Sequence, residues 1–84
     1  MLMEITFDQH KRLANLAKHG LDFADLTIGF FEAAHVEPAK QDRYLAIGEF
    51  RGEVIIAVIF RPLGSEAISI ISMRRASKSE RTRL

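Results

Sequence analysis

Two short basic clusters in this chain hold residue types that can bind a phosphodiester and move protons beside it. The first is residues 18–20 (Lys-His-Gly), and the second is residues 72–81, which include Arg74 and Arg75. A guanidinium holds phosphate oxygens through two hydrogen bonds and keeps its charge at any working pH. An imidazole titrates near neutrality, so it serves as a general acid or base. Both clusters are therefore candidates for chemistry on a phosphodiester.

His19 has two interpretations, and the sequence alone leaves both open. As the last residue of a helix it improves the energy of the helix dipole by about 0.3–1 kcal/mol. Alternatively, it transfers protons beside Lys18. The neighbouring ammonium disfavours the imidazolium, which favours a base role near neutral pH.

Arg74 and Arg75 end an otherwise apolar strand pattern, in which successive residues point to opposite faces. Arg74 shares the side of Ile70 and Ser72 by this alternation. We therefore expect one arginine to line a cleft and the other to face solvent or a partner. Glu80 has three candidate roles: it caps the last helix, orients an arginine or accepts a proton.

Helical elements place the first cluster at a chain turn. Asp8 is a good N-cap, because its carboxylate accepts from the free amides of the first turn. Gly20 is typical of the left-handed residue that ends a helix. These signals predict a helix over residues 8–19, in which Leu13 and Leu16 recur at helical spacing.

Two further helices are predicted. One runs from Asp22 to about residue 31, with Phe23, Leu26 and Phe30 on one apolar stripe. The other begins at residues 77–80 (Ser-Lys-Ser-Glu), which form a capping box, and runs to the C-terminus.

Strand patterns occupy the rest of the chain. Residues 3–7 are a candidate short strand, and residues 32–42 form a loop or an edge strand. Three strands of an antiparallel meander follow at residues 43–50, 54–60 and 67–74, and the second is apolar on both faces, as expected at the centre of a sheet. The predicted fold is α+β: two N-terminal helices, an antiparallel sheet of three to four strands, and a short C-terminal helix.

Composition and charge narrow the class of protein. The 84 residues form one domain, and the absence of cysteine rules out disulfides and thiolate zinc sites. No apolar run approaches the ~20 residues of a membrane span, and we expect a cytoplasmic protein. The net charge is polarised, with −3 on residues 1–60 and +4 on residues 61–84. Such a distribution attracts a polyanion to one end of the molecule.

Two functional classes are disfavoured. A helix–turn–helix centred on Gly20 requires a recognition helix that presents cations or amides to bases, whereas the second predicted helix presents Asp22 and Asp25. A histidine metal site is disfavoured because His10, His19 and His35 are far apart in sequence. We therefore expect neither direct DNA reading nor a bound metal or other cofactor.

An ordered set of residues across nearly the whole chain resembles the BrnT family of toxins from bacterial type II toxin–antitoxin systems. The set comprises Phe7-Asp8, Lys11, Asn15, Lys18-His19-Gly20, Phe23, Ile71-Ser72-Met73-Arg74-Arg75-Ala76 and Glu80-Arg81. The resemblance implies a fold similar to the RelE group of ribonucleases and a metal-independent endoribonuclease that arrests translation and growth. It also implies a ribbon–helix–helix antitoxin, often in a 2:2 complex, through which alone operator DNA is bound.

The resemblance also implies which residues act on RNA. Catalytic positions carried over by motif are Lys18, His19, Arg74 and Glu80. Candidate RNA-contacting cations are Arg43, Arg51, Arg61, Arg75 and Lys78. This reading requires the His19 imidazole and the Arg74 guanidinium to converge on one concave surface.

Two departures from the family pattern bear on activity. Many members have an arginine where this chain has Ser69, and an aromatic residue where it has Leu84. Loss of a cation from the sheet weakens RNA binding unless Arg61 or Arg75 replaces it. The alternative function is a non-catalytic module that binds a DNA-binding partner in transcriptional autoregulation.

Overall fold

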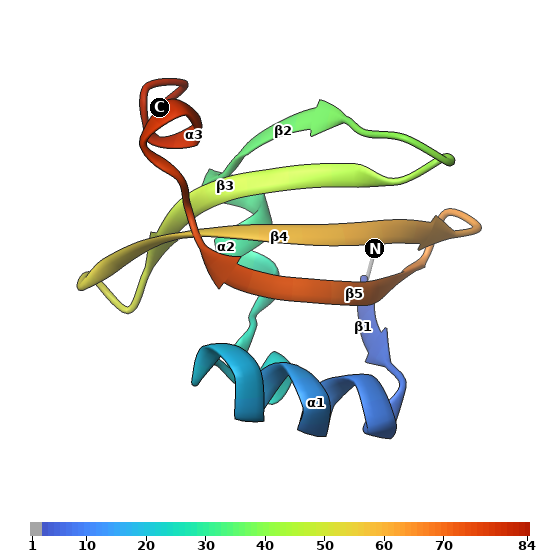
Figure 1. Cartoon of the computed structure of the whole chain (residues 1–84). Helices are drawn as coiled ribbons and strands as arrows, with labels where there is room; N and C mark the ends of the chain where they lie inside the picture. Colours follow the sequence, from blue (N-terminus) through green and yellow to red (C-terminus); the bar gives the residue numbers. More distant parts are fainter. Residues whose placement is uncertain (1–2) are drawn as a thin grey trace.

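A five-stranded mixed sheet forms the centre of the computed structural model, which describes residues 3–84. Its strands are β1 (Glu4–Phe7), β2 (His35–Pro38), β3 (Tyr44–Phe50), β4 (Val54–Leu63) and β5 (Ala67–Arg75). The strand order is β1-β5-β4-β3-β2, and β1 runs parallel to β5 while the other pairs are antiparallel (Figure 1).

Within residues 3–84, four helical segments accompany the sheet. They are α1 (Gln9–His19), the 3₁₀ helix η1 (Phe23–Asp25), α2 (Ile28–Ala33) and α3 (Lys78–Arg81). Among the residues that the structure describes, no helix combines the length and apolar character needed to cross a membrane.

The α+β class and the β3-β4-β5 meander are confirmed, but the expected antiparallel sheet of three to four strands is wrong. The segment left open as a loop or edge strand forms β2, and β1 adds a parallel strand on the other side. β1 pairs residues 4–7 with residues 67–70 of β5. This pairing satisfies backbone groups of β5 that would otherwise form an open sheet edge.

The single helix expected over residues 22–31 is also wrong, because the chain breaks it into η1 and α2. Asp22 caps η1 by accepting from the Ala24 amide at 2.9 Å, and Thr27 caps α2 by accepting from the Phe30 amide at 3.3 Å. Side-chain oxygens of this kind offer the backbone an alternative to a continuous helix. The break at Leu26 still buries Phe23, Leu26 and Phe30 in the core.

The two faces of the sheet differ in what covers them. The larger core lies on the face that packs against η1 and α2, and it includes Phe23, Phe30, Ile56, Ile70 and Met73. The opposite face carries Leu45 and Ile47 of β3, residues 55, 57, 59 and 61 of β4, and Ser72 and Arg74 of β5. We call this second surface the open face, because in Figure 1 no helix crosses its middle, with α1 along one border and α3 along another.

A β-bulge decides which residues of β5 reach the open face. Ile59 pairs with Ser72 while Phe60 pairs with Ile70, so Ile71 is an extra residue on β5. Ile70 and Met73 are therefore both buried in the larger core, and Ser72 and Arg74 turn to the open face. The expectation that Arg74 shares the side of Ile70 is wrong for this reason.

Helix α1 ends as its capping residues predict, but its buried face differs from the expected stripe. Asp8 accepts from the amides of His10 and Lys11, and Gly20 is left-handed with φ 70°. Leu13 and Leu16 are exposed, and the buried residue of α1 is the polar Asn15.

Gly48 offers a test of the packing between β3 and α2. A Cβ at Gly48 would lie 3.1 Å from Phe30 Cε1 and 3.3 Å from Ala34 Cβ. We expect Gly48→Ala to lower the free energy of unfolding by about 1–3 kcal/mol through overpacking, measured by urea denaturation. Gly29→Ala is the control, because its Cβ meets only Thr27 Oγ1 at 3.7 Å and alanine favours the helix by about 0.5–1 kcal/mol. Equal stability of Gly48→Ala and the parent chain would contradict this packing.

Candidate active site

One side of α1, from residue 11 to residue 19, and residues 71 and 72 of β5 form the two walls of a shallow groove. Its volume is about 260 Å³, and it is lined by Lys11, Ala14, Asn15, Lys18, His19, Ile71 and Ser72. His19 is part-buried there, while Lys18 is exposed. The groove therefore offers an imidazole and two ammonium groups to a ligand that reaches Ser72.

Arg74 is the next open-face residue of β5 after Ser72. Alternate residues of a strand lie about 6.5–7 Å apart, so Arg74 follows directly beyond the groove. Its guanidinium donates two hydrogen bonds to the Glu80 carboxylate, Nη1 to Oε1 at 2.7 Å and Nη2 to Oε2 at 2.9 Å. The Arg74 side chain keeps 36% of its surface exposed, so it remains accessible to an anion.

Glu80 is held by the start of α3 as well as by Arg74. Its Oε1 accepts from the Ser77 amide at 2.8 Å, and the Ser77 hydroxyl accepts from the Glu80 amide at 3.1 Å, which completes the predicted capping box. The hydrogen bonds from Arg74 lower the pKa of the buried Glu80 carboxyl to about 2, and the carboxylate raises the pKa of Arg74. Both groups are therefore charged at neutral pH.

A second ion pair joins the C-terminal segment to β2, the edge strand of the sheet farthest from β1. Arg83 donates to the Glu37 carboxylate of β2, which also lies 2.9 Å from His35 Nε2. With the Arg74–Glu80 pair, this contact fixes α3 over one border of the open face. The short helix thus keeps Glu80 against Arg74.

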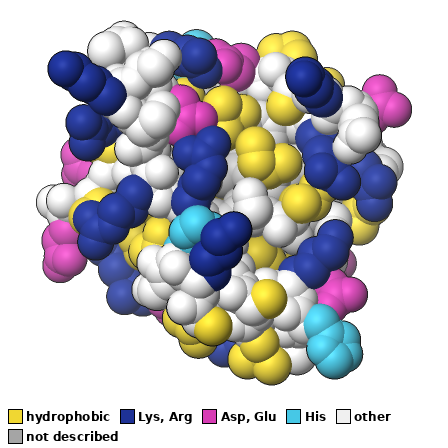
Figure 2. Space-filling model, in the orientation of Figure 1, with side chains coloured by type: hydrophobic (Ala, Val, Ile, Leu, Met, Phe, Trp, Pro, Cys, Tyr) yellow, Lys and Arg dark blue, Asp and Glu magenta, His cyan; other side chains and the backbone are white. Residues whose placement is uncertain are grey.

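The candidate RNA-contacting cations fall into two groups. Arg61 is exposed on the open face, opposite Ser69, and Arg43 precedes β3 on the same side by strand alternation. Figure 2 shows Lys and Arg side chains around this face, with hydrophobic side chains between them. The Arg43 Nε is buried and has no hydrogen-bond partner among the described residues. Arg43 and Arg61 thus extend the basic surface away from Arg74.

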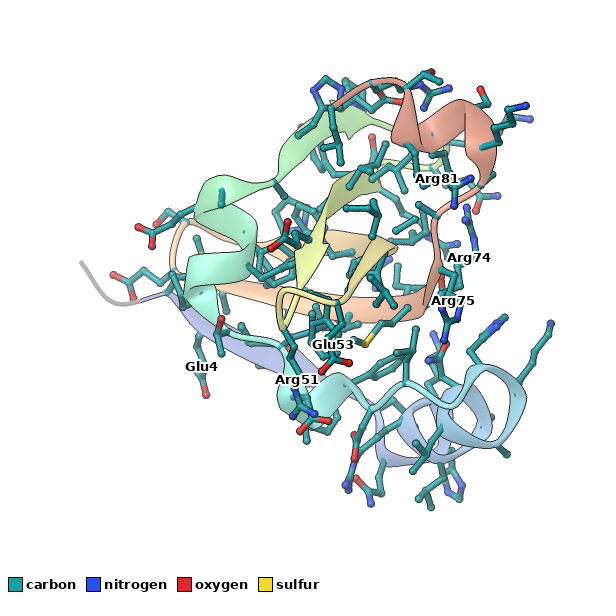
Figure 3. All side chains as sticks on the ribbon, turned by 90° about the vertical axis from the view of Figure 1, so that its left-hand side faces the viewer. Glu4, Arg51, Glu53, Arg74, Arg75 and Arg81 are labelled. Atoms are coloured by element: carbon teal, nitrogen blue, oxygen red, sulfur yellow. The ribbon has the colours of Figure 1, made fainter. Side chains whose placement is uncertain are left out.

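Arg51 and Arg75 lie elsewhere. Arg51 sits at the tip of the β3–β4 hairpin, away from Arg74 (Figure 3), where it contacts Asp25 Oδ1 at 3.0 Å. Arg75 pairs across the sheet with Ile56, a residue of the helix-covered core. The structure therefore does not bring these two cations to the open face. Lys78 is exposed in the first turn of α3.

Sequence reasoning gave no site role to three polar residues of the groove. Lys11 and Asn15 line it because they lie eight and four residues before His19, on one face of the helix. This spacing is visible in the sequence and could have predicted that both residues lie beside His19. Ser72 enters through the bulge at Ile71, for which the sequence offers no signal. Within residues 3–84, no three His, Cys, Asp or Glu side chains cluster as metal ligands would.

The Arg74–Glu80 pair predicts a specific dependence of stability on pH. The folded pKa of Glu80, about 2, lies below its ordinary value of 4.5, so its stabilisation is complete above about pH 5 and disappears as pH falls toward 2. We expect Glu80→Gln to lower the free energy of unfolding on the order of 3 kcal/mol at pH 7, with the difference vanishing near pH 2. Denaturant unfolding at several pH values measures it.

The matched control is Glu66→Gln, which removes an exposed carboxylate from the β4–β5 turn. It should stay within about 0.5 kcal/mol of the parent chain at every pH. A Glu80→Gln deficit that is independent of pH would contradict the ion pair as its source.

Comparison with known proteins identifies the family of this chain. A family model described as the ribonuclease toxin BrnT of type II toxin–antitoxin systems matches residues 7–80. The crystal structure of the Brucella abortus ribonuclease toxin BrnT, determined at 1.1 Å resolution, is 63% identical, covers 90% of this chain and 99% of that one, and superposes with a TM-score of 0.86. No curated protein sequence gave a significant match. The chain belongs to the BrnT family of ribonuclease toxins of type II toxin–antitoxin systems.

Proposed function

We propose that this toxin is a metal-independent endoribonuclease whose site is the groove between α1 and β5 together with Arg74. The observation that supports it is that His19, Lys18 and Ser72 line one groove, and Arg74 follows Ser72 on the same face. In this proposal, one phosphodiester bound beside Ser72 contacts an acid–base group, an ammonium and a guanidinium.

RNA supplies its own nucleophile, so the chain needs to provide proton transfer and positive charge. The ribose 2′-oxygen forms a bond to phosphorus, its proton passes to a base, and the bond from phosphorus to the 5′-oxygen breaks as that oxygen receives a proton. His19 serves one of these two proton transfers. Lys18 and Arg74 stabilise the charge that grows on the phosphorane oxygens. The products are a 2′,3′-cyclic phosphate and a free 5′-hydroxyl.

Glu80 acts as the group that orients Arg74, and the proton-accepting role is the less favourable of its candidate roles. Its carboxylate already accepts two hydrogen bonds from Arg74 and one from the Ser77 amide. A pKa of about 2 makes it a weak base at neutral pH. The bidentate pair fixes the plane of the guanidinium, and the exposed part of that group faces the substrate.

The substrate strand continues along the sheet toward Arg61 and Arg43. Arg61 lies four residues along β4 from Ala57, the partner of Arg74, which corresponds to about 13 Å. A single-stranded RNA crossing this distance places a second phosphate near Arg61. That contact compensates for the missing cation at Ser69, which is the cross-strand partner of Arg61.

The remaining elements of the proposal concern the cell. A type II toxin pairs with a protein antitoxin, and we propose a ribbon–helix–helix protein in a 2:2 complex that binds operator DNA through the antitoxin alone. RNA cleavage in the cytoplasm would arrest translation and growth. The fold's likeness to the RelE group stays a prediction. Support for these points comes from the family membership and from the basic 61–84 segment.

The direct test uses purified chain and end-labelled single-stranded RNA, with and without EDTA. We expect cleavage in both conditions and 2′,3′-cyclic phosphate ends. Cleavage that requires a divalent ion would overturn the metal-independent part. Tight binding of the antitoxin with no cleavage of any RNA tested would favour the non-catalytic binding module instead.

Arg61 on the open face and Arg51 at the hairpin tip give a charge-matched test of where RNA binds. Arg61→Ala should weaken binding of single-stranded RNA and lower the slope of log affinity against log salt by about 0.7, the value for one phosphate contact. Arg51→Ala removes the same charge from the hairpin tip, so we expect no change in affinity or slope. Fluorescence anisotropy at several salt concentrations measures both. If Arg51→Ala weakened RNA binding and Arg61→Ala did not, the RNA would not bind the open face.

A further inference from the structure

The Asn15 carboxamide makes three hydrogen bonds at the junction between α1 and β5. Its Nδ2 donates to the Met73 carbonyl at 2.8 Å and to the Leu21 carbonyl at 3.1 Å, while its Oδ1 accepts from the Met73 amide at 3.1 Å. The residue is 8% exposed. Both amide protons and the carbonyl oxygen of the side chain are therefore used in a nearly dry environment.

Asn15 occupies the place of a missing strand residue. β1 pairs with β5 only as far as Phe7 and Ile70, after which Asp8 caps α1 and the chain leaves the sheet. Beyond that point, the carboxamide exchanges both hydrogen bonds with Met73, as two backbone residues do in an antiparallel pair. The side chain thus continues the pairing of β5 at an edge that β1 has left.

These three bonds join the two halves of the candidate site at positions adjacent to its working residues. Met73 lies between Ser72 and Arg74, and Leu21 lies two residues after His19, just beyond Gly20. We infer that Asn15 is the positioning residue that sets the distance between the His19 imidazole and the Arg74 guanidinium. Asn15 and His19 are one helical turn apart, so a rotation of α1 that breaks the Met73 contact also moves the imidazole.

The packing of α1 leaves this task to Asn15. Asn15 is the buried residue of the helix, whereas Leu13 and Leu16 are exposed. The other polar anchor, Arg12 with Asp22, ties α1 to the cap of η1 and not to β5. Apolar burial alone does not fix the rotation of α1 against the strand that carries Arg74. A displacement of about 1 Å at a reacting group is enough to lower a rate by about 10²-fold.

The experiment compares Asn15→Ala with Thr6→Val. Thr6 also donates a side-chain hydrogen bond to β5, from Oγ1 to the Ile68 carbonyl at 2.9 Å, but it lies on β1 and not on α1. The inference rests on the proposed function for its kinetic measurement. We expect Asn15→Ala to lower kcat per folded molecule by at least about tenfold, with the Kd for 2′-O-methylated RNA little changed. Thr6→Val should keep the parent kcat per folded molecule.

A merely structural role predicts a different pattern. Loss of folded protein would lower the total cleavage rate and the binding capacity together, and it would leave the His19 ring signals of the remaining folded molecules unmoved. If Asn15 positions the imidazole, the ¹H–¹⁵N NMR signals of the His19 ring shift in Asn15→Ala and stay in place in Thr6→Val. Unchanged His19 signals together with parent kcat in folded Asn15→Ala would overturn the inference.

The wild-type chain provides a measurement that needs neither cleavage nor a folded variant. We expect both Asn15 side-chain amide protons and the Met73 amide proton to exchange slowly with solvent, because all three are hydrogen-bonded at the junction. Fast exchange of these protons in the intact protein would contradict the three hydrogen bonds of Asn15. Slow exchange in a chain that cleaves no RNA would support these hydrogen bonds, while the proposed function would fail.

Discussion

Replacing His19 by alanine is expected to lower the rate of RNA cleavage by about 10²–10⁴-fold at neutral pH, the loss that follows removal of a general acid or base. The groove retains Lys18 and Ser72 in this variant, so RNA still binds. The effect should therefore appear in the cleavage rate and not in the affinity for 2′-O-methylated RNA. Single-turnover cleavage of end-labelled RNA and anisotropy binding measure the two quantities separately.

The other two histidines serve as controls for this substitution. His10 is exposed in the first turn of α1, and His35 is paired with Glu37 on β2. We expect His10→Ala and His35→Ala to cleave at the parent rate. Circular dichroism spectra would be used to check that all three variants are folded. A folded His19→Ala chain that cleaves as fast as the His10→Ala chain would remove His19 from the mechanism.

Replacing Arg74 by alanine is expected to lower the cleavage rate by about 10²–10³-fold, as for the loss of one donor that stabilises a developing oxyanion. Arg74→Lys keeps a positive charge but not the planar fork that Glu80 holds, so we expect it to restore only part of the rate. Because Arg74→Ala leaves the Glu80 carboxylate buried and unpaired, this variant should also be less stable. The cleavage assay is therefore run at a temperature at which unfolding curves show it to be folded.

The neighbouring arginine is the matched control for Arg74. Arg75→Ala removes the same group from the adjacent position of β5. Arg75 lies on the other side of the sheet, with its cross-strand partner Ile56. Its cleavage rate should equal that of the parent chain. If Arg75→Ala and Arg74→Ala lost activity to the same extent, net charge rather than the geometry of the open face would explain the loss.

The features of the fold that depend on local chemistry could be predicted from the sequence. The Asp8 N-cap, the left-handed Gly20 and the capping box of Ser77 and Glu80 each act within one helical turn, and the structure has all three. The central place of β4 also followed from a local pattern, since its residues are apolar on both faces. Signals of this kind are complete within a few neighbouring residues.

The features that depend on distant partners could not be predicted. The parallel pairing of β1 with β5 joins residues about sixty positions apart, and the bulge at Ile71 arises only when β5 meets β4. That bulge reverses the alternation after Ile70 and brings Ser72 and Arg74 to the open face. Alternation along a single strand therefore assigned Arg74 to the wrong side relative to Ile70.

The residues of the candidate site also fall into those that the sequence could identify and those that depend on distant partners. Residue type and family resemblance selected His19, Lys18, Arg74 and Glu80, and the structure gathers the last two in a bidentate pair. Charge alone could not distinguish Arg61, on the open face, from Arg51 at the hairpin tip. Asn15 appeared in the sequence as one polar residue of a helix. Its importance becomes visible only with the partners on β5 in place.

A crystal structure of this toxin with a short 2′-O-methylated RNA tests the central claim most directly. One phosphate of the strand should contact both the His19 ring and the Arg74 guanidinium, with a further phosphate near Arg61. An RNA bound across the Arg51 hairpin and Arg75, with no phosphate shared between the end of α1 and the end of β5, would contradict the account.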